Sequence, residues 1–320
     1  EAREVMGVKH NIISAQSNCP VIGLIQDALL GAFLLSGATL RPDQAMQVAM
    51  QPTGCTGREI ISTILPNITY ERGDVKIIEG VFLEGRLTKK DVGKSNGSIN
   101  HVIYNDIGPD ACVEFMYNLQ RLAHRYLQIR GFTIGIGDLV RSKEATIKCE
   151  AEREAAFEEA KTLEDPNARL NACRAIMGKA VIEGMDETNN FYAMVHSGSK
   201  GSLVNLTQVQ ACLGQMNVQG GRMPLQWGER TATQFERGET GPLSRGFVSH
   251  SFLDGLSPFE MFAHSMSGRE GLIDTAIKTA QTGYTERKLM KCLENITTHI
   301  DGTVRDGDRI IQFLYGDDGF

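Results

Sequence analysis

A stripe of very small side chains marks the segment 258–293 as a candidate contact surface. Its members recur at helical spacing and therefore share one face; they are Thr275, Ala276, Thr279, Ala280 and Gly283. Such a face lets a broad, flat group approach the backbone, and the adjacent Tyr284 offers a ring on which a nucleobase can stack. Close packing against a second helix selects the same small residues. The spacing alone leaves both interpretations open.

An acidic motif near the end of the chain is the second candidate. Gly316-Asp317-Asp318 matches the Gly-Asp-Asp with which palm-type viral polymerases hold Mg²⁺. Asp301 and Asp306 have the Asp-x4-Asp spacing of the other metal carboxylate in those enzymes, but they lie too close to Asp317 for a palm domain to intervene. We interpret the motif as an acidic turn, and keep a self-contained palm polymerase as an alternative.

A glycine-rich stretch around Lys200 is the third candidate. Gly198-Ser199-Lys200-Gly201-Ser202 could cradle a phosphate through backbone N–H groups, although it lacks the full phosphate-loop spacing. An ordinary glycine-rich turn is the simpler interpretation. The order of Ser, His, Asp and Cys residues does not predict a hydrolytic triad.

Composition limits the class of protein. The chain has 320 residues and a net charge of −6, which argues against holding nucleic acid by bulk charge. Its seven dispersed cysteines form no Cys-x-x-Cys pair, so we expect reduced thiols in an intracellular protein and no zinc site. No apolar run is long enough to span a bilayer, so no membrane is expected. The first residue is Glu1 and not Met, from which we expect a longer parent polypeptide.

Hydrophobic periodicity predicts mostly helices, with a few short strands. We expect helices over 23–36, 57–65, 110–131, 141–161, 167–183 and 205–215, and strands over 75–78 and 81–83. The two charged helices either side of Asp165-Pro166 predict an antiparallel pair.

The best-specified helix begins at Ser257-Pro258-Phe259-Glu260, a capping box, and extends to Leu293. Its length of about 36 residues corresponds to roughly 54 Å. It contains Gly268, Gly271 and Gly283, each costing about 1 kcal/mol relative to Ala in a helix interior. We therefore expect it to bend, to be closely approached, or to flex. Its cations are Arg269, Lys278, Arg287, Lys288 and Lys291.

Several blocks, taken together and in order, resemble the largest subunit of multisubunit DNA-directed RNA polymerases of the eukaryotic nuclear or large-DNA-virus type. They are Gln16-Ser17-Asn18-x-Pro20-x-x-Gly23-x-x-Gln26-Asp27, Gly131-x-Thr133-Ile134-Gly135-Ile136-Gly137-Asp138, Ser197-Gly198-x-Lys200-Gly201-Ser202, Gly241-Pro242-x-Ser244-Arg245-Gly246-Phe247-Val248, the run from Gly268 to Tyr284, and Tyr315-Gly316-x-Asp318-Gly319. The Gly268–Tyr284 run is the most specific of them.

The resemblance implies a mixed α+β, predominantly helical fold in three parts. Residues 1–140 would be the pore region with its short strands. Residues 141–250 would be the funnel with its helical hairpin, and 251–320 the long bridge helix and the start of the cleft region. We accordingly interpret the chain as an internal portion of the subunit.

The resemblance also assigns residues to roles. On the bridge helix, Thr275, Ala276, Lys278, Thr279, Ala280, Gly283 and Tyr284 would contact the template, and Lys200 would lie near the route by which nucleotides enter. The pocket of a fungal cyclic-peptide inhibitor would be lined by Asn171, Arg174, Gln208, Gln215, His264 and Glu270. Met216 replaces a second expected Gln, which puts sensitivity to that inhibitor in doubt.

The chemistry implied for the parent enzyme is template-directed RNA synthesis by two-metal phosphoryl transfer. Its Mg²⁺ and Zn²⁺ ligands would lie outside this chain: Val304 stands where Asp306-Gly307-Asp308 would need a further Asp to form the metal motif. The isolated piece is expected to be inactive. Implied partners are the second-largest and smaller polymerase subunits, template DNA and the DNA–RNA hybrid, ribonucleoside triphosphates, and a transcript-cleavage factor at the funnel. The location would be the nucleus for a cellular enzyme, or a cytoplasmic factory or virion for a viral one. The alternative is a non-catalytic helical scaffold for such subunits and factors.

Overall fold

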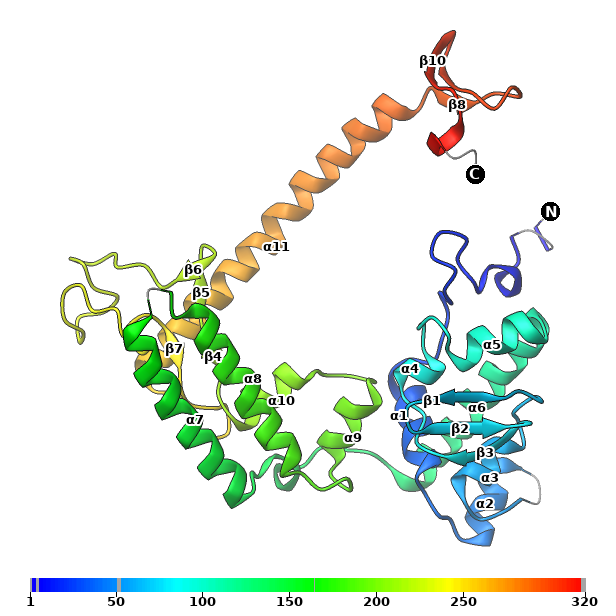
Figure 1. Cartoon of the computed structure of the whole chain (residues 1–320), viewed down its shortest axis with the longest axis horizontal. Coiled ribbons are helices and arrows are strands. Elements are labelled where there is room, and N and C mark those ends of the chain that lie inside the picture. The colour runs from blue at the N-terminus through cyan, green and yellow to red at the C-terminus, as the bar shows by residue number, and fades with distance from the viewer. Residues whose placement is uncertain (1, 4–5, 51–52, 164, 318–320) are drawn as a thin grey trace. The chain divides into compact units, whose positions relative to one another are not determined.

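The computed structural model describes residues 2–3, 6–50, 53–163 and 165–317 (Figure 1). Asp318 and Gly319, the last residues of the acidic motif and of the closing block, lie outside this range. The chain divides into two compact units. The first comprises residues 1–215, 241–243 and 247–257, and the second comprises 216–240, 244–246 and 258–320.

Helices predominate in the first half of the first unit, with one small sheet among them. The 3₁₀ helix η1 (Val8–Asn11) precedes α1 (Gln26–Ser36), α2 (Pro42–Ala49) and α3 (Gly57–Ser62). Then come β1 (Tyr70–Arg72), β2 (Val75–Ile78) and β3 (Val81–Glu84), followed by α4 (Lys89–Val92), α5 (Ile99–Asp106) and α6 (Pro109–Arg130). The strands form an antiparallel sheet in the order β1-β2-β3. A core that includes Leu29, Ile60, Ile77, Phe115 and Leu119 joins the helices to this sheet.

The second half of the first unit is built on a helical pair. The 3₁₀ helix η2 (Ile136–Leu139) leads to α7 (Lys143–Thr162) and α8 (Asn167–Glu183), which pack along one another, and then to α9 (Asn190–Ser197) and α10 (Leu203–Gln210). The strands β4 (Gly214–Gln215) and β7 (Phe247–Val248) pair antiparallel. A second core, including Cys149, Leu170, Cys173 and Phe247, lies beneath α7 and α8.

The second unit is dominated by α11 (Pro258–Leu293), a continuous helix of 36 residues. The hairpin of β5 (Asn217–Val218) and β6 (Gly221–Arg222) contacts it. After α11 come β8 (Ile296–Thr298), β9 (Val304–Asp306) and β10 (Arg309–Gln312), a sheet in the order β10-β9-β8, and the short η3 (Tyr315–Asp317). Although α11 is long, no helix of the described residues combines the length and the apolar character needed to cross a bilayer.

The predominantly helical α+β class is confirmed, and most expected elements are present, but several boundaries differ. The first long helix starts at Gln26 and not at Gly23, because Gly23 lies against the backbone of Gly93, where a Cβ would be 2.5 Å from the Gly93 carbonyl carbon. The helix after Lys200 covers Leu203–Gln210 and stops before Gln215, because the chain leaves ideal helical geometry at Ala211, with φ of −111° and ψ of −76°, and then forms β4. The predicted helix over 57–65 ends at Ser62.

Candidate nucleic-acid interface and nucleotide-route loop

The small-residue stripe lies in the middle of α11 and is exposed throughout. The threonine hydroxyls on this stretch bond back into their own helix: Thr275 Oγ1 donates to the Gly271 carbonyl at 2.9 Å, and Thr279 Oγ1 donates to the Thr275 carbonyl at 2.7 Å. Because each hydroxyl is used internally, the γ-methyl group is the part of the threonine that remains for a contact. The stripe is therefore smooth and largely apolar, despite its threonines.

The glycines of α11 are regular helical residues in this structure. A Cβ built on Gly268, Gly271 or Gly283 would meet no atom of the described residues within 4 Å. The helix is continuous across all three. Packing against another helix of the described residues does not account for the small side chains.

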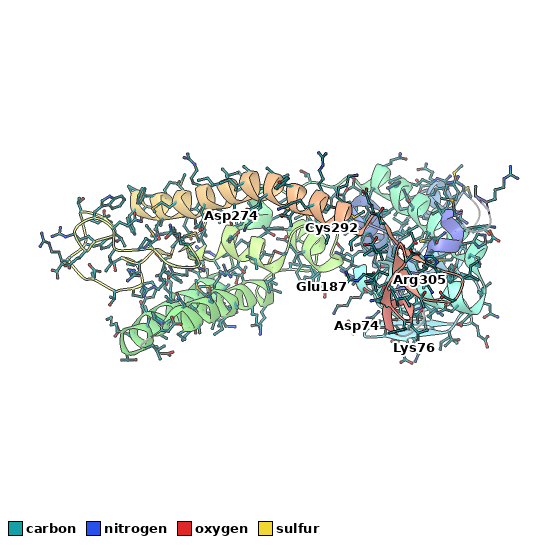
Figure 2. The ribbon with its side chains drawn as sticks, turned by 90° about the horizontal axis from the view of Figure 1, so that it is seen from above. Asp74, Lys76, Glu187, Asp274, Cys292 and Arg305 are labelled. Carbon is teal, nitrogen blue, oxygen red and sulfur yellow. The ribbon has the colours of Figure 1, made fainter. Side chains whose placement is uncertain are left out.

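Charged and aromatic side chains border the stripe. Lys278 Nζ lies 2.7 Å from Asp274 Oδ2, and this hydrogen bond raises the pKa of Lys278. Lys288 Nζ lies 4.4 Å from the centroid of the Tyr284 ring, a cation–π contact on an exposed surface. Figure 2 shows side chains projecting around this helix, with Asp274 and Cys292 labelled. Both cations can move to an incoming phosphate at small cost, because exposed pairs contribute about 1 kcal/mol or less.

Glu270 has a structural role that the sequence did not indicate. The Gln219 backbone N–H donates a bifurcated hydrogen bond to the two carboxylate oxygens of Glu270, at 2.8 and 2.9 Å, and so attaches the β5–β6 turn to α11. Gln219 and Gly220 both have positive φ, as a two-residue hairpin turn requires. Beside this attachment lies a groove of about 470 Å³, lined among others by Val218, Phe262 and Ile273.

The six residues expected to line the inhibitor pocket are divided between the two units. Asn171, Arg174, Gln208 and Gln215 belong to the first unit, and His264 and Glu270 to the second. Within the first unit, Arg174 covers β4, since a Cβ on Gly214 would lie 2.8 Å from its Cδ. Gln215 is buried in β4, whereas Asn171 is exposed on α8.

Lys200 lies in the loop between α9 and α10 and is exposed. The glycines on either side, Gly198 and Gly201, both have φ of +74°, a conformation that other residues rarely adopt. Ser197 and Ser199 donate their hydroxyl protons to the Met194 carbonyl, each at 3.1 Å. This stretch is a rigid turn that displays Lys200, and it anchors α10 through the Ser202 cap on Asn205 N.

The Gly135-Ile136-Gly137-Asp138 block is explained by the contacts of Asp138. Its carboxylate accepts from Gly135 N at 2.8 Å and from Asn190 N at 3.1 Å. Its carbonyl accepts from the side-chain amides of Asn189 at 2.9 Å and Gln210 at 3.0 Å. Asp138 thus fixes the start of α9 and the end of α10, which lie either side of the Lys200 loop.

The acidic residues near the end of the chain serve turns. Asp301 accepts from Thr303 N at 3.1 Å and from Thr303 Oγ1 at 2.6 Å, and these bonds lower the pKa of Asp301 to about 2. Asp306 pairs with Arg309 across the Gly307-Asp308 turn of the β9–β10 hairpin. Among the described residues, no group of three or more His, Cys, Asp or Glu side chains could hold a metal ion.

Comparison with known families places nearly the whole chain in one class of protein. Three consecutive family models match: RNA polymerase Rpb1 domain 3 over residues 11–139, domain 4 over 141–248, and domain 5 over 255–320. The chain therefore belongs to the family of largest subunits of DNA-directed RNA polymerase, of which it represents an internal portion.

Two relatives make the relationship more specific. The DNA-directed RNA polymerase II subunits RPB1-A and RPB1-B of Trypanosoma brucei brucei are each 34% identical to it over 370 aligned residues, an alignment that includes 100% of this chain. The same alignment covers 21% of each relative, so the chain spans about a fifth of the length of these curated relatives.

Proposed function

We propose that the chain works within a DNA-dependent RNA polymerase, which synthesises RNA from ribonucleoside triphosphates on a DNA template, and that α11 is its bridge helix. The observation that carries this proposal is the exposed stripe from Thr275 to Gly283, with its hydroxyls bonded inward. A template base pair is broad, flat and largely apolar on its face, and so is this stripe. Tyr284 and Lys278, with the rest of the set named above, would complete the template contact.

The bond-forming chemistry would be carried by residues outside this chain. Two-metal phosphoryl transfer requires clustered carboxylates for Mg²⁺, and the described residues provide no such cluster. The same holds for the Zn²⁺ of the parent subunit, because four-ligand sites need grouped Cys or His side chains. The role of this portion is positioning, with template on α11 and nucleotides passing Lys200.

The limits of the family matches support a division into a pore region, a funnel and a bridge-helix region near residues 140 and 250. We propose as partners the second-largest and smaller polymerase subunits, template DNA with the DNA–RNA hybrid, and a transcript-cleavage factor at the funnel. A nuclear location accords with the polymerase II relatives. The six inhibitor-pocket residues remain a prediction.

A matched pair of bulky substitutions on α11 tests the template contact. Thr279→Phe places a ring on the stripe, and Gln281→Phe places the same ring on the opposite face, since both positions are exposed. In the assembled enzyme we expect the Thr279→Phe variant to elongate at least tenfold more slowly, a barrier increase of about 1.4 kcal/mol or more, and to misincorporate more often. The Gln281→Phe variant should lose much less. Equal elongation rate and fidelity in wild type and Thr279→Phe would disprove the assignment.

The surface of α7 favours a second role, binding a partner protein at the funnel. Glu152 and Glu159 hold Arg169 of α8 and Glu158 pairs with Lys161 at 2.7 Å, whereas Glu150 and Glu154 are exposed at i, i+4 spacing, where like charges repel. A basic partner would relieve that repulsion. Charge reversal of Glu150 and Glu154 should weaken binding of a transcript-cleavage factor in a pull-down while elongation continues; unchanged binding would exclude this surface.

A further inference from the structure

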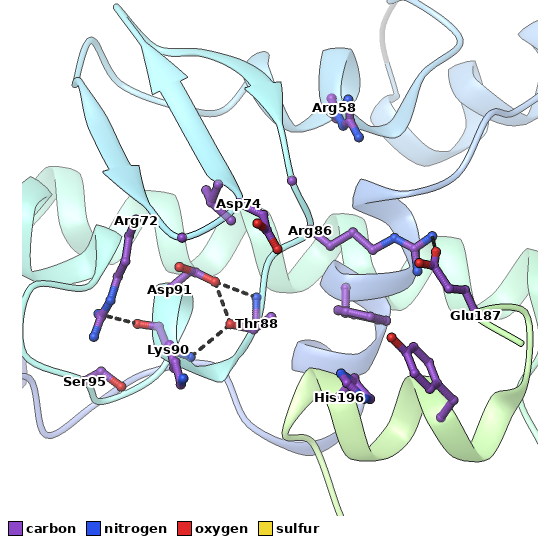
Figure 3. Close-up of a pocket in the computed structure, with 15 residues that line it drawn as sticks. Arg58, Arg72, Asp74, Arg86, Thr88, Lys90, Asp91, Ser95, Glu187 and His196 are labelled. Atoms are coloured by element: carbon purple, nitrogen blue, oxygen red, sulfur yellow. Dashed lines mark hydrogen bonds and ion pairs between the residues drawn. The ribbon is translucent and has the colours of Figure 1, made fainter. Parts of the chain in front are cut away.

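A large cleft in the first unit has no part in the proposed function of α11. Its volume is about 890 Å³, and it lies among α1, the β1–β2 turn, α4 and α9, as Figure 3 shows. Four cations line it: Arg58, Arg72, Arg86 and Lys90. In a chain with a net charge of −6, so many cations around one cleft call for an explanation.

The arginines are held in place by one edge of each guanidinium. Arg58 Nη1 donates to the Leu83 carbonyl at 3.1 Å, and Arg72 Nη1 donates to the carbonyls of Lys90 and Asn96 at 3.0 and 3.1 Å. A guanidinium has five N–H donors in a planar fork, so an arginine anchored in this way keeps donors for a ligand. Anchored, preorganised arginines are suited to phosphate oxygens, because little side-chain entropy remains to be lost.

The acidic residues of the cleft are mostly engaged. Glu187 pairs with Arg86 at 3.0 Å, and both oxygens of the buried Asp91 accept from Tyr70 and Thr88. Asp74 is exposed and accepts no hydrogen bond within the described part of the chain. Lys90 is likewise exposed, and its Nζ has no acceptor there. Once Glu187 is paired with Arg86, the remaining cations Arg58, Arg72 and Lys90 outnumber the remaining acids, Asp74 and Asp91. The cleft therefore has an excess of positive charge.

One wall of the cleft is aromatic. The rings of Tyr192 and His196 on α9 stack with centroids 3.9 Å apart and planes inclined by 19°. Burial lowers the pKa of His196 and so favours its uncharged imidazole. On another wall, the Arg86 guanidinium lies 5.5 Å from the centroid of the Phe33 ring. Flat uncharged rings beside anchored cations form a site with a place for a planar base and a place for phosphates.

We propose that this cleft binds a compact oligophosphate anion, with its phosphate oxygens on Arg72 and Lys90 and, where a nucleobase is attached, the base against His196. The anion could be free or could be the tail of a nucleotide, since both present the same chemistry to the arginines. This site is separate from the template contact on α11, and either proposal can fail without the other.

Two substitutions with opposite expected signs test the site. In the assembled enzyme, Lys90→Met removes an attraction and Asp74→Asn removes a repulsion. We expect Lys90→Met to weaken binding of inorganic tripolyphosphate about fivefold, which corresponds to about 1 kcal/mol, and Asp74→Asn to strengthen it by a similar factor. Lys94→Met is the matched control, because Lys94 is an exposed lysine just beyond α4 that does not line the cleft.

Hydrogen–deuterium exchange locates the binding site and distinguishes a free oligophosphate from a nucleotide as the ligand. With EDTA present to suppress metal-dependent binding elsewhere, tripolyphosphate should protect peptides over 70–78 and 85–96 in the wild type, but less in Lys90→Met. If ATP binds more tightly and also protects 189–198, the ligand is a nucleotide; equal affinities indicate a free oligophosphate. The proposal is overturned if these peptides are not protected, or if Lys90→Met and Lys94→Met bind equally.

Discussion

The threonines of α11 show how a polar residue type can produce an apolar surface. Four of them, Thr275, Thr279, Thr282 and Thr285, donate their hydroxyl protons to carbonyls of the preceding turn. The hydroxyl thereby becomes part of the helix backbone network, and the methyl group becomes the exposed feature. Such a surface therefore presents no free hydroxyl hydrogen to a group that contacts it.

The buried cysteines give a residue-scale prediction. Burial raises the pKa of Cys112 and Cys173 to about 11 and that of Cys212 to about 12, from an ordinary value of 9.0. Because the thiolate is the reactive form, these thiols should resist N-ethylmaleimide at pH 8, as measured by mass spectrometry. The folded state binds these protons more tightly, so its stability should fall as the pH rises above about 9.

The control for this prediction is the same labelling after denaturation, when all seven cysteines should react. Half-buried Cys19 and Cys55 should react at intermediate rates. Labelling of Cys212 as fast as that of Cys55 in the folded enzyme would contradict the burial on which the argument depends.

At the scale of elements, α11 accepts glycines that nothing in the described structure requires. Several glycines elsewhere have a local reason, such as the positive φ of Gly198 or the approach of Gly31 to the Ala123 carbonyl, where a Cβ would lie 2.7 Å away. Gly268, Gly271 and Gly283 have neither reason, because they are helical and uncrowded. Their benefit must come from flexibility or from contacts beyond this chain.

Gly283→Ala distinguishes these two possibilities. Alanine should stabilise the helix by about 1 kcal/mol. If translocation requires α11 to bend at this point, elongation should slow by about fivefold and its temperature dependence should steepen, as measured by single-turnover nucleotide addition. Gly268→Ala, nearer the start of the helix, is the comparison. Faster or unchanged elongation in Gly283→Ala would contradict a hinge at this position.

At the scale of the whole molecule, the elements with strong local signals were predictable. The helix α8 covers Asn167–Glu183 as expected, between Pro166 and Gly184, and α11 begins at Pro258 and ends at Leu293 as expected. The strands β2 and β3 were likewise recognised from β-branched runs between glycines.

Elements and sites that depend on distant residues were not predictable. The helix α9 was missed, although Asn189 caps its start locally by accepting from the backbone N–H groups of Phe191 and Tyr192. Its bond to Asp138, 52 positions before Asn190, is the part that no local pattern indicates. The cleft of Arg58, Arg72 and Lys90 is completed by His196 of α9, and no local pattern joins such separate segments. In contrast, the small-residue stripe of α11 could be read from the sequence, because helical periodicity places its members on one face without any tertiary information.

Because α11 is almost completely exposed, its helical structure depends on contacts outside the described residues. Of its side chains, those buried within the described structure are Glu260 and Ala263. A helix of this length with three glycines and almost no buried face has only marginal stability of its own in water. If a neighbouring subunit covers α11 in the enzyme, binding of that subunit also stabilises the helix, and dissociation is coupled to local melting. We then expect loss of that subunit to lower the helicity of this segment, which is roughly 54 Å long.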